Sequence, residues 1–448
     1  MTRPRAHPLY FALSCALAIP SVFADSAPPH ALPRPIVGFQ VRGHSKLTEA
    51  TARSLSHVSE GDLVDASDLP QLEQAFLSSE LFASVTITLE DAPGGVLLIA
   101  ILEDKHSWIV APTVFLQPGS RAFGLGFVEN NLRGMNQKLL LYGQVGTRES
   151  LLFATYLNPS MSGTPISYRL DFYAFRRQLA EYTNPLDDPT NHEVARTTTT
   201  TYVGAGALVG WRFAWWLAAD LRLRGARVTF RNARAEGRDH EPVLVPERDG
   251  WDVTVQSRLT LDARHHRHGV TWGPFVQVMT DDSIPGLDDY DYSSLFARAY
   301  ESWRLFHEHQ LELRAGVRYG FHLPLQEEFT LGGAGDLRGY AVDRFRGDTR
   351  VVGRVEYSVP ISKWKSFAFR AIGFWDAGYV GFRNQRRGGD RLYLPSERDG
   401  RGWFRNDVGA GLRVYTNAIV LPLLGLDVGY GIEGHSPVLY FELGLTDF

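Results

Sequence analysis

Apolar and polar residues alternate one by one over most of the chain beyond residue 105. In the segment 309–321 one face would carry Leu311, Leu313, Ala315, Val317, Tyr319 and Phe321, and the other Glu312, Arg314, Gly316, Arg318 and Gly320. The segment 215–230 repeats the pattern. An alternation of period two predicts β-strands with one apolar face. Since the second face is charged, the pattern is typical of a barrel with lipid outside and water inside.

Sixteen segments with this character can be delimited, and we predict sixteen antiparallel strands. They are 108–116, 121–131, 136–146, 149–159, 164–177, 199–211, 215–230, 250–263, 269–280, 292–305, 309–321, 349–361, 365–380, 404–416, 422–433 and 437–448. Long connections, at 178–198, 231–249, 322–348 and 381–403, all follow odd-numbered strands. Short turns on one side and long loops on the other are expected of a bacterial outer-membrane barrel, as is an even strand number.

The segment before the barrel has another pattern. Residues 36–41 read as a strand, 47–58 and 67–82 as helices with apolar residues at helical spacing, and 85–90 and 96–102 as two further strands around a Pro-Gly-Gly turn. The predicted fold class is therefore an all-β transmembrane barrel, residues 106–448, preceded by one small α+β domain of order βααββ, residues 33–105.

The first residues have the order of a secretory signal peptide. Arg3 and Arg5 precede an apolar stretch of about fourteen residues, which is shorter than the roughly 20 that a membrane-spanning helix needs. We expect residues 1–24 to be removed by cleavage after Ala24. Cys15 is the only cysteine, so the mature chain would have no disulfide and no thiol nucleophile.

Composition agrees with a barrel. Aromatic residues make up 12% of the chain and 43 residues are glycine, while no later segment is long and apolar enough for a membrane helix. The net charge of −4 gives no support for nucleic-acid binding. We find no nucleophile elbow, phosphate-binding loop or zinc-protease motif. We therefore expect no enzyme activity, no cofactor and no metal.

Two polar clusters remain open. The run 264–268 contains three histidines, and Asp281 and Asp282 with the acidic group 288–291 lie in a predicted outer loop. Either could bind a metal ion, but such runs are usually solvated turns and loops.

The loop 322–348 contains Leu331-Gly-Gly-Ala-Gly-Asp-Leu-Arg-Gly-Tyr340. Through its Arg338-Gly339-Tyr340 tripeptide, and through the strands around Glu356 and Asp376, the sequence resembles the BamA/TamA superfamily of outer-membrane assembly and translocation barrels. The resemblance implies that the loop folds back into the lumen, where its arginine meets acidic residues on the next two strands. The small domain likewise resembles a POTRA domain, which in that family docks substrate strands or partner proteins at a sheet edge.

Alternation places the two carboxylates independently of the resemblance. Val355 and Tyr357 would face lipid, so Glu356 faces inward, and Trp375 would face lipid, so Asp376 also faces inward. A planar guanidinium can make forked bonds to both carboxylates. The pattern predicts a lumenal loop lock, which is either part of transport or only a structural brace.

The last strand would turn Leu439, Phe441, Leu443 and Leu445 to lipid. Phe441, Gly444, Leu445 and the terminal Phe448 resemble an outer-membrane sorting signal, although Thr446 stands where a large apolar residue is common. Pro112 in the first strand cannot donate a backbone hydrogen bond, so a weak seam between first and last strand is plausible.

These features lead to one main hypothesis and its alternatives. The main hypothesis is a non-enzymatic, monomeric barrel that inserts or translocates polypeptides across the outer membrane. Its partners would be outer-membrane lipid and a polypeptide substrate or periplasmic protein at the N-terminal domain, which lies in the periplasm. The alternatives are a passive pore or surface antigen with the same fold, a lipid-handling barrel, and an N-terminal domain that serves only as plug or spacer. One POTRA-like domain, where better-known assembly factors have several, speaks against a central assembly role.

Overall fold

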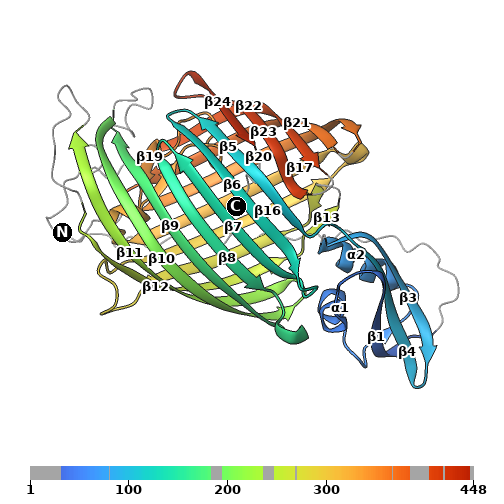
Figure 1. Cartoon of the computed structure of the whole chain (residues 1–448). Helices are drawn as coiled ribbons and strands as arrows, with labels where there is room; N and C mark the ends of the chain where they lie inside the picture. Colours follow the sequence, from blue (N-terminus) through green and yellow to red (C-terminus); the bar gives the residue numbers. More distant parts are fainter. Residues whose placement is uncertain are drawn as a thin grey trace, which may run out of the picture.

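The computed structural model describes residues 32–443 except 80, 183–193, 236–246, 268–269, 366, 384–402 and 417–418. The expected signal segment 1–24 and three residues of the expected sorting signal, Gly444, Leu445 and Phe448, therefore lie outside the described residues. The chain forms a small α+β domain beside one end of a β-barrel (Figure 1). We call this end of the barrel the near end and the opposite one the far end. Within the described ranges, no helix combines the length and apolarity needed to cross a membrane.

The N-terminal domain is a four-stranded sheet with two helices. The strand order is β2-β1-β4-β3, with β1 and β4 parallel. The elements are β1 (Arg34–His44), α1 (Glu49–Ser56), β2 (Leu63–Val64), α2 (Leu69–Ser78), β3 (Phe82–Ala92) and β4 (Gly95–Asp104). The order is therefore βαβαββ, and the predicted βααββ lacked only β2, which is too short to show an alternation.

Local chemistry sets the ends of the first helix. The Thr48 hydroxyl accepts a hydrogen bond from the Thr51 N–H at 3.2 Å, which satisfies one of the free donors of the first turn. Residue His57 ends the helix in the left-handed conformation, with φ of 59°. The apolar sides of both helices pack on the sheet, in a core that includes Phe39, Phe76 and Leu98.

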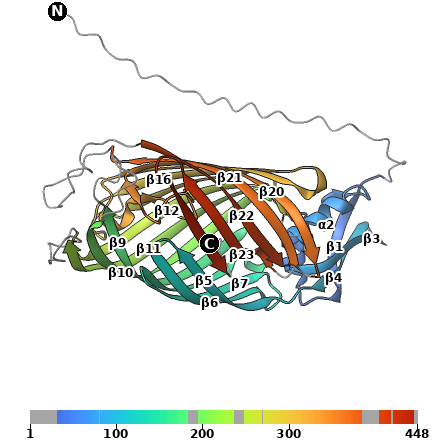
Figure 2. The same ribbon diagram turned by 90° about the horizontal axis from the view of Figure 1, so that it is seen from above.

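Figure 2 shows the barrel from the side, with the N-terminal domain beyond one end. The barrel is closed and has sixteen antiparallel strands, as predicted. They are β5 (Trp108–Gln117), β6 (Ser120–Leu132), β7 (Gln137–Gly146), β8 (Glu149–Asn158), β9 (Ile166–Tyr182), β10 (Val194–Ala214), β11 (Leu217–Ala235), β12 (Gly250–Asp262), β15 (Phe275–Ser283), β16 (Ser293–Arg304), β17 (Gln310–Phe321), β20 (Thr349–Trp364), β21 (Phe367–Gly381), β22 (Trp403–Thr416), β23 (Ile419–Gly431) and β24 (Ser436–Leu443).

The alternation in the sequence becomes an inner and an outer surface. On β17, Leu313 and Val317 are exposed on the outside, whereas Glu312, which lies opposite Glu356 of β20, is buried on the inside. The same holds on β11, where Leu221 and Leu223 are exposed. The outer wall is therefore apolar along its strands, as contact with lipid requires.

Several strand boundaries differ from the prediction; β9 and β11, for example, each end five residues later than predicted, at Tyr182 and Ala235. The predicted strand 269–280 begins only at Phe275, because Gly273 has φ of +104° and Pro274 lacks an N–H; a small hairpin, β13 (His265–Arg267) and β14 (Val270–Trp272), precedes it. Strand β10 starts at Val194, five residues earlier than predicted. The predicted turn 362–364 is part of β20, which continues past a bulge between Pro360 and Ser362.

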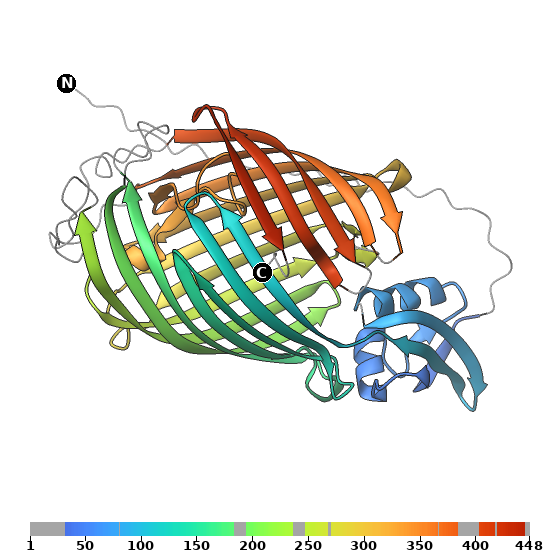
Figure 3. The same ribbon diagram turned by 45° about the horizontal axis from the view of Figure 1, so that its top comes forward.

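The connection between β17 and β20 is folded inside the barrel. It contains η3 (Leu325–Glu327) and the short pair β18 (Phe329–Leu331) and β19 (Phe345–Gly347). Leu331, Leu337 and Tyr340 of this segment are buried together against Val380 of β21. Seen obliquely, the segment lies within the ring of strands (Figure 3). We call residues 322–348 the lumenal loop.

Candidate functional site: the lumenal loop and its anchors

Arg338 of the lumenal loop lies between carboxylates of the barrel wall. Its Nε and Nη2 donate to the two oxygens of Asp376 on β21 at 2.7 and 2.9 Å. Its Nη1 donates to Glu356 on β20 at 2.8 Å and lies 3.5 Å from Asp427 on β23. The side chain is 1% exposed, and Asp376 is fully buried. The structure thus brings together Arg338, Glu356 and Asp376, in the forked geometry that suits guanidinium and carboxylate.

Further side chains complete this cluster. Arg354 donates to Asp376 at 3.1 Å and to the carbonyl of Ala334 at 3.0 Å, so it ties the same carboxylate to the loop backbone. The Arg338 guanidinium also lies 3.4 Å from the centre of the Phe374 ring. Charge and ring together hold the guanidinium in one orientation.

Gly339 is placed where only glycine fits. Its N–H donates to Asp407 of β22 at 2.9 Å. A Cβ at this position would come within 2.5 Å of the Asp407 Cβ and would overlap the backbone of Gly431 on β23. The loop backbone therefore lies directly on the inner wall, and a side chain would lift it away.

Tyr340 binds the far ends of the last strands. Its hydroxyl donates to Glu433, which follows β23, and to the carbonyl of Asn406 at 3.3 Å. Its own carbonyl accepts a hydrogen bond from the hydroxyl of Tyr440 on β24. The Arg-Gly-Tyr tripeptide consequently contacts every strand from β20 to β24.

The next part of the loop is anchored on the opposite side of the barrel. Asp343 forms ion pairs with Arg177 of β9 and, at 3.9 Å, with Arg148, which also donates to the carbonyl of Val342 at 3.1 Å. Burial raises the pKa of Asp343, but the charges of Arg177 and Arg148 outweigh it and lower the pKa to about 2.

The first part of the loop has a third anchor. Glu327 of η3 lies 3.5 Å from Arg224 on β11, and Arg224 also contacts Asp252 of β12 at 3.3 Å. Burial raises the pKa of Glu327 to about 8, and the charges of Asp252 and Asp281 add to the rise, although Arg224 opposes it. The loop is therefore fastened to three parts of the wall and crosses the lumen between them.

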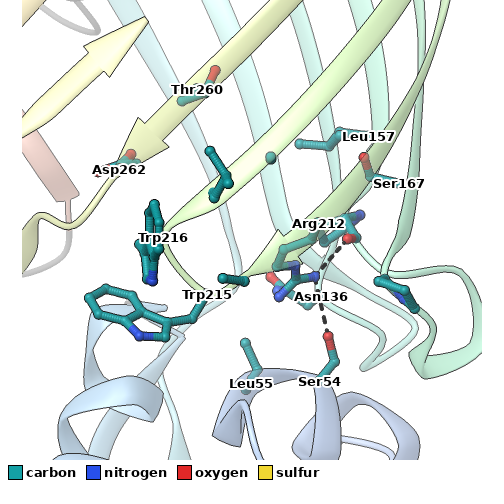
Figure 4. A pocket seen from close by; sticks show the side chains of 15 residues that line it. Ser54, Leu55, Asn136, Leu157, Ser167, Arg212, Trp215, Trp216, Thr260 and Asp262 are labelled. Carbon is teal, nitrogen blue, oxygen red and sulfur yellow. Dashed lines mark hydrogen bonds between the residues drawn. The ribbon is translucent and has the colours of Figure 1, made fainter.

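Helix α1 contacts the near end of the barrel. The Thr48 N–H donates to the carbonyl of Gly134 in the turn between β6 and β7 at 3.2 Å. Arg212 of β10 donates to the carbonyl of Pro159 at 3.0 Å and reaches the Ser54 hydroxyl of α1 at 3.5 Å (Figure 4). These contacts place the N-terminal domain against the near-end turns.

A cavity of about 280 Å³ lies at this junction, lined by α1 and by Trp215 and Trp216 in the turn between β10 and β11 (Figure 4). The ring of His57, at the end of α1, lies 6.5 Å from that of Trp215. Burial and the nearby charge of Arg212 lower the pKa of His57 to about 4. His57 is therefore neutral in the docked domain near pH 7.

Sequence reasoning identified the arginine and two of its carboxylates but not the rest of the site. Asp407 and Asp427 are inward residues of predicted strands and were within reach of the alternation argument. The alternation likewise placed Tyr440 inward, between the outward Leu439 and Phe441, whereas Asp343 and Glu327 lie in the loop and carried no such signal. Among the described residues, the structure has no cluster of three metal-ligating side chains, and the acidic group 288–291 instead caps backbone N–H groups of Trp251 and Val253.

Comparisons with known proteins agree with this architecture. Residues 131–446 match the family described as Omp85 superfamily domain. Solved structures with a similar fold include BamA from Haemophilus ducreyi lacking POTRA domains 1-3, with 16% identity, a TM-score of 0.58, and coverage of 91% of this chain and 84% of that one. CdiB from Acinetobacter baumannii has 15% identity and a TM-score of 0.60, and the alignment covers 92% of this chain and 74% of CdiB. CdiB from Escherichia coli has 13% identity and a TM-score of 0.60, and the alignment covers 91% of this chain and 76% of CdiB. No curated protein sequence matches the chain.

A closed sixteen-stranded barrel with an apolar outer wall is the fold of an outer-membrane protein. The match covers well over half of the chain, and the protein belongs to the Omp85 superfamily. The predicted resemblance and the predicted barrel are both confirmed.

Proposed function

We propose that the protein inserts or translocates polypeptides across the bacterial outer membrane, with its N-terminal domain in the periplasm. The near end of the barrel is then the periplasmic end and the far end the cell surface. The lumenal loop would act as a lock that must loosen before substrate passes. The observation that carries the proposal is the seam between the first and last strands of the barrel.

Among the described residues, which end at Leu443, strands β5 and β24 are joined by a ladder of three residue pairs. In the part of the chain that the structure describes, they pair only at Phe441 with Leu116, Glu442 with Phe115, and Leu443 with Val114. The neighbouring ladder between β5 and β6 runs from Trp108 to Gln117. Pro112, which cannot donate to a ladder, lies just beyond the paired stretch of β5. Since Ser436–Leu439 of β24 lie beyond the end of β5 at Gln117 and Pro112 lacks a donor, we take this seam as the place where the barrel wall opens most easily.

The loop lock and the seam are physically connected. Tyr440 lies on β24, just before the paired stretch, and is 1% exposed. Because its hydroxyl donates to the carbonyl of Tyr340, any movement of the Arg-Gly-Tyr tripeptide changes the support of the last strand. This contact favours a transport role for the lock over that of a brace alone.

The N-terminal domain offers an edge for substrate strands. Strand β3 is the outer strand of its sheet and spans eleven residues, whereas β2 at the other edge has two. The outer edge of β3 has no neighbouring strand among those described, and although its Ile87 N–H donates to Glu73 of α2 at 3.1 Å, an extended segment can add to the other backbone groups. This supports a role in delivering polypeptide to the barrel.

A reversible disulfide across the seam tests the proposal. We would replace Val114 and Leu443 by cysteine, since directly opposite residues of an antiparallel pair lie about 4.5–5.5 Å apart, which a disulfide can span. The control pair is Leu141 and Ala154, which lie opposite each other on β7 and β8. Each variant would replace the native protein in cells, and outer-membrane and secreted proteins would be quantified by mass spectrometry.

We expect oxidation of the seam pair to lower the amount of assembled or secreted substrate, and a reductant to restore it, while the control pair changes nothing. The proposal would be refuted if cells with the locked seam and cells with the unlocked seam contained equal amounts of assembled or secreted substrate. A steady ion conductance in planar bilayers that persists with the seam locked and the N-terminal domain deleted would instead favour the passive pore.

A further inference from the structure

The inner wall over β15, β16 and β17 carries arginines interleaved with aromatic rings. Arg298 lies opposite Gly316, Phe296 opposite Arg318, and Tyr300 opposite Arg314. Leu313 and Val317 of β17 face outward, so Arg314 and Arg318 of that strand face the lumen, and so do the residues of β16 that lie opposite them. Phe275 of β15 pairs with Tyr300 and extends the same inward row. We call Arg264, Arg298, Arg314 and Arg318 with these rings the arginine track.

Each guanidinium of the track lies near one or two rings. Arg264 is 4.3 Å and Arg298 5.0 Å from the centre of the Phe275 ring. Arg318 is 4.8 Å from that of Phe296, and Arg314 is 5.6 Å from that of Tyr300. Stacking on rings holds the cations in place without neutralising them.

The track has more positive charge than its neighbouring carboxylates neutralise. Arg264 pairs with Asp262 at 2.7 Å, and Arg314 pairs with Glu312. Arg298 and Arg318 form no ion pair with any carboxylate among the described residues. Arg298 is exposed to the lumen, and 48% of the Arg314 side chain is exposed.

The loop lock on the adjoining strands, which begin at β20 directly beside β17, has the opposite character. There Arg338, Arg354 and Arg413 each bind a carboxylate within 3.1 Å. Arg298 and Arg318 therefore leave positive charge on the inner wall beside the lock, where the ring centre of Phe329 of the lumenal loop lies 5.8 Å from the Arg318 guanidinium. Arg298 is exposed to the lumen and Arg318 is partly buried, and such unpaired guanidinium groups in a lumen walled by low-dielectric protein and lipid would attract anions strongly.

We propose that the arginine track binds an extended acidic segment of the transported polypeptide. The inference rests on the proposed function and names the chemistry of its substrate. Arg264 follows the near end of β12, and Arg318 lies in the far half of β17, so the track runs along the direction of transport. Guanidinium forks bind carboxylates in preference to neutral side chains.

The spacing of the track matches an extended chain. Arg314 and Arg318 are four residues apart on one strand, which is about 14 Å at the usual rise of about 3.4 Å per residue. An extended peptide presents side chains on one face about every 7 Å, so its acidic residues at every second or fourth position coincide with these arginines. The aromatic rings between them contact other side chains without demanding one sequence.

The test measures peptide binding to the purified mature protein. A fluorophore attached to S294C on the inward face of β16 reports on the track, because the only other cysteine, Cys15, precedes the expected cleavage site. The probes are twelve-residue peptides that alternate serine with glutamate, glutamine or lysine. Inorganic polyphosphate serves as a non-peptide polyanion.

We expect the glutamate peptide to bind, more weakly at high salt, and the glutamine and lysine peptides to bind at least about tenfold more weakly. The double variant R298Q and R318Q should lower the affinity for the glutamate peptide by about tenfold or more. The double lysine variant, which keeps the charge and loses the fork, should be intermediate. The matched control R231Q removes one exposed arginine at the far end of β11 and should bind like the native protein.

Three results would overturn the inference: equal binding of glutamate and glutamine peptides, unchanged binding in both double variants, or binding of polyphosphate without binding of the glutamate peptide. Failure of the proposed function is distinguishable, because binding needs no opening of the seam. If the protein binds the glutamate peptide yet secretes normally with its seam locked, the proposed function is refuted, whereas the inference that the arginine track binds acidic peptides stands.

Discussion

Replacing Arg338 by alanine is the most direct perturbation of the loop lock. The change leaves the fully buried Asp376 with Arg354 as its remaining ion-pair partner and Asp427 with Arg413. Removing one member of a buried ion pair costs about 3–5 kcal/mol. Since those two arginines remain and Glu356 is 19% exposed, we take the lower limit, about 3 kcal/mol. This corresponds to roughly a 150-fold shift from the attached toward the released loop.

Amide hydrogen exchange of residues 331–347 measures this shift. We expect exchange in R338A to be faster by roughly that factor, and R338K to be intermediate because lysine lacks the planar fork. The control R231A removes an exposed pair with Asp249, which is worth about 0–1 kcal/mol, and should leave exchange in the loop unchanged. Equal protection of the loop in R338A and the native protein would refute the reasoning, because the contacts to Asp376 would then contribute nothing to its attachment.

Three further predictions concern other contacts. The substitution G339A should loosen the loop by about 1–3 kcal/mol, because its Cβ has no room beside Gly431; loop exchange as slow as in the native protein would contradict this. D343N should weaken the attachment of residues 342–347 by about 1–2 kcal/mol, so that their amides exchange faster, and should leave the Arg338 contacts intact. Equally faster exchange around Arg338 would count against separate anchors. This anchor is fully charged above about pH 3.8 and is lost as the pH falls toward 2. Docking of the N-terminal domain should weaken as the pH falls from about 6.5 to about 4, because His57 is protonated more easily when undocked; distance measurements between domain and barrel should show this in the native protein and not in H57Q.

Much of the barrel could be predicted from the sequence because its determinant is local. Each strand, such as β17, alternates apolar and polar residues, and lipid outside and water inside impose this pattern on every strand separately. The count of sixteen and the inward positions of Glu356 and Asp376 followed from that alternation. Boundaries were less certain where one residue interrupts the ladder, as Gly273 does before β15.

The loop lock was only partly accessible to sequence reasoning. The Arg-Gly-Tyr tripeptide could be assigned through its resemblance to a family, and its two nearest carboxylates through strand alternation. The anchor at Asp343 was not, since a loop residue has no periodicity and nothing in the sequence says which wall it will meet; for the same reason the partner of the inward Tyr440 could not be named.

The sequence by itself therefore determined the barrel, its strand number, its small preceding domain and the inner or outer face of each strand residue. Only the tertiary structure decided which inward residues meet across the lumen, that helix α1 contacts the near-end turns, and that Arg298 and Arg318 remain without carboxylate partners among the described residues. The physical reason is that alternation is fixed by each strand's own surroundings. Pairing across the lumen depends instead on barrel closure and on the path of one long loop.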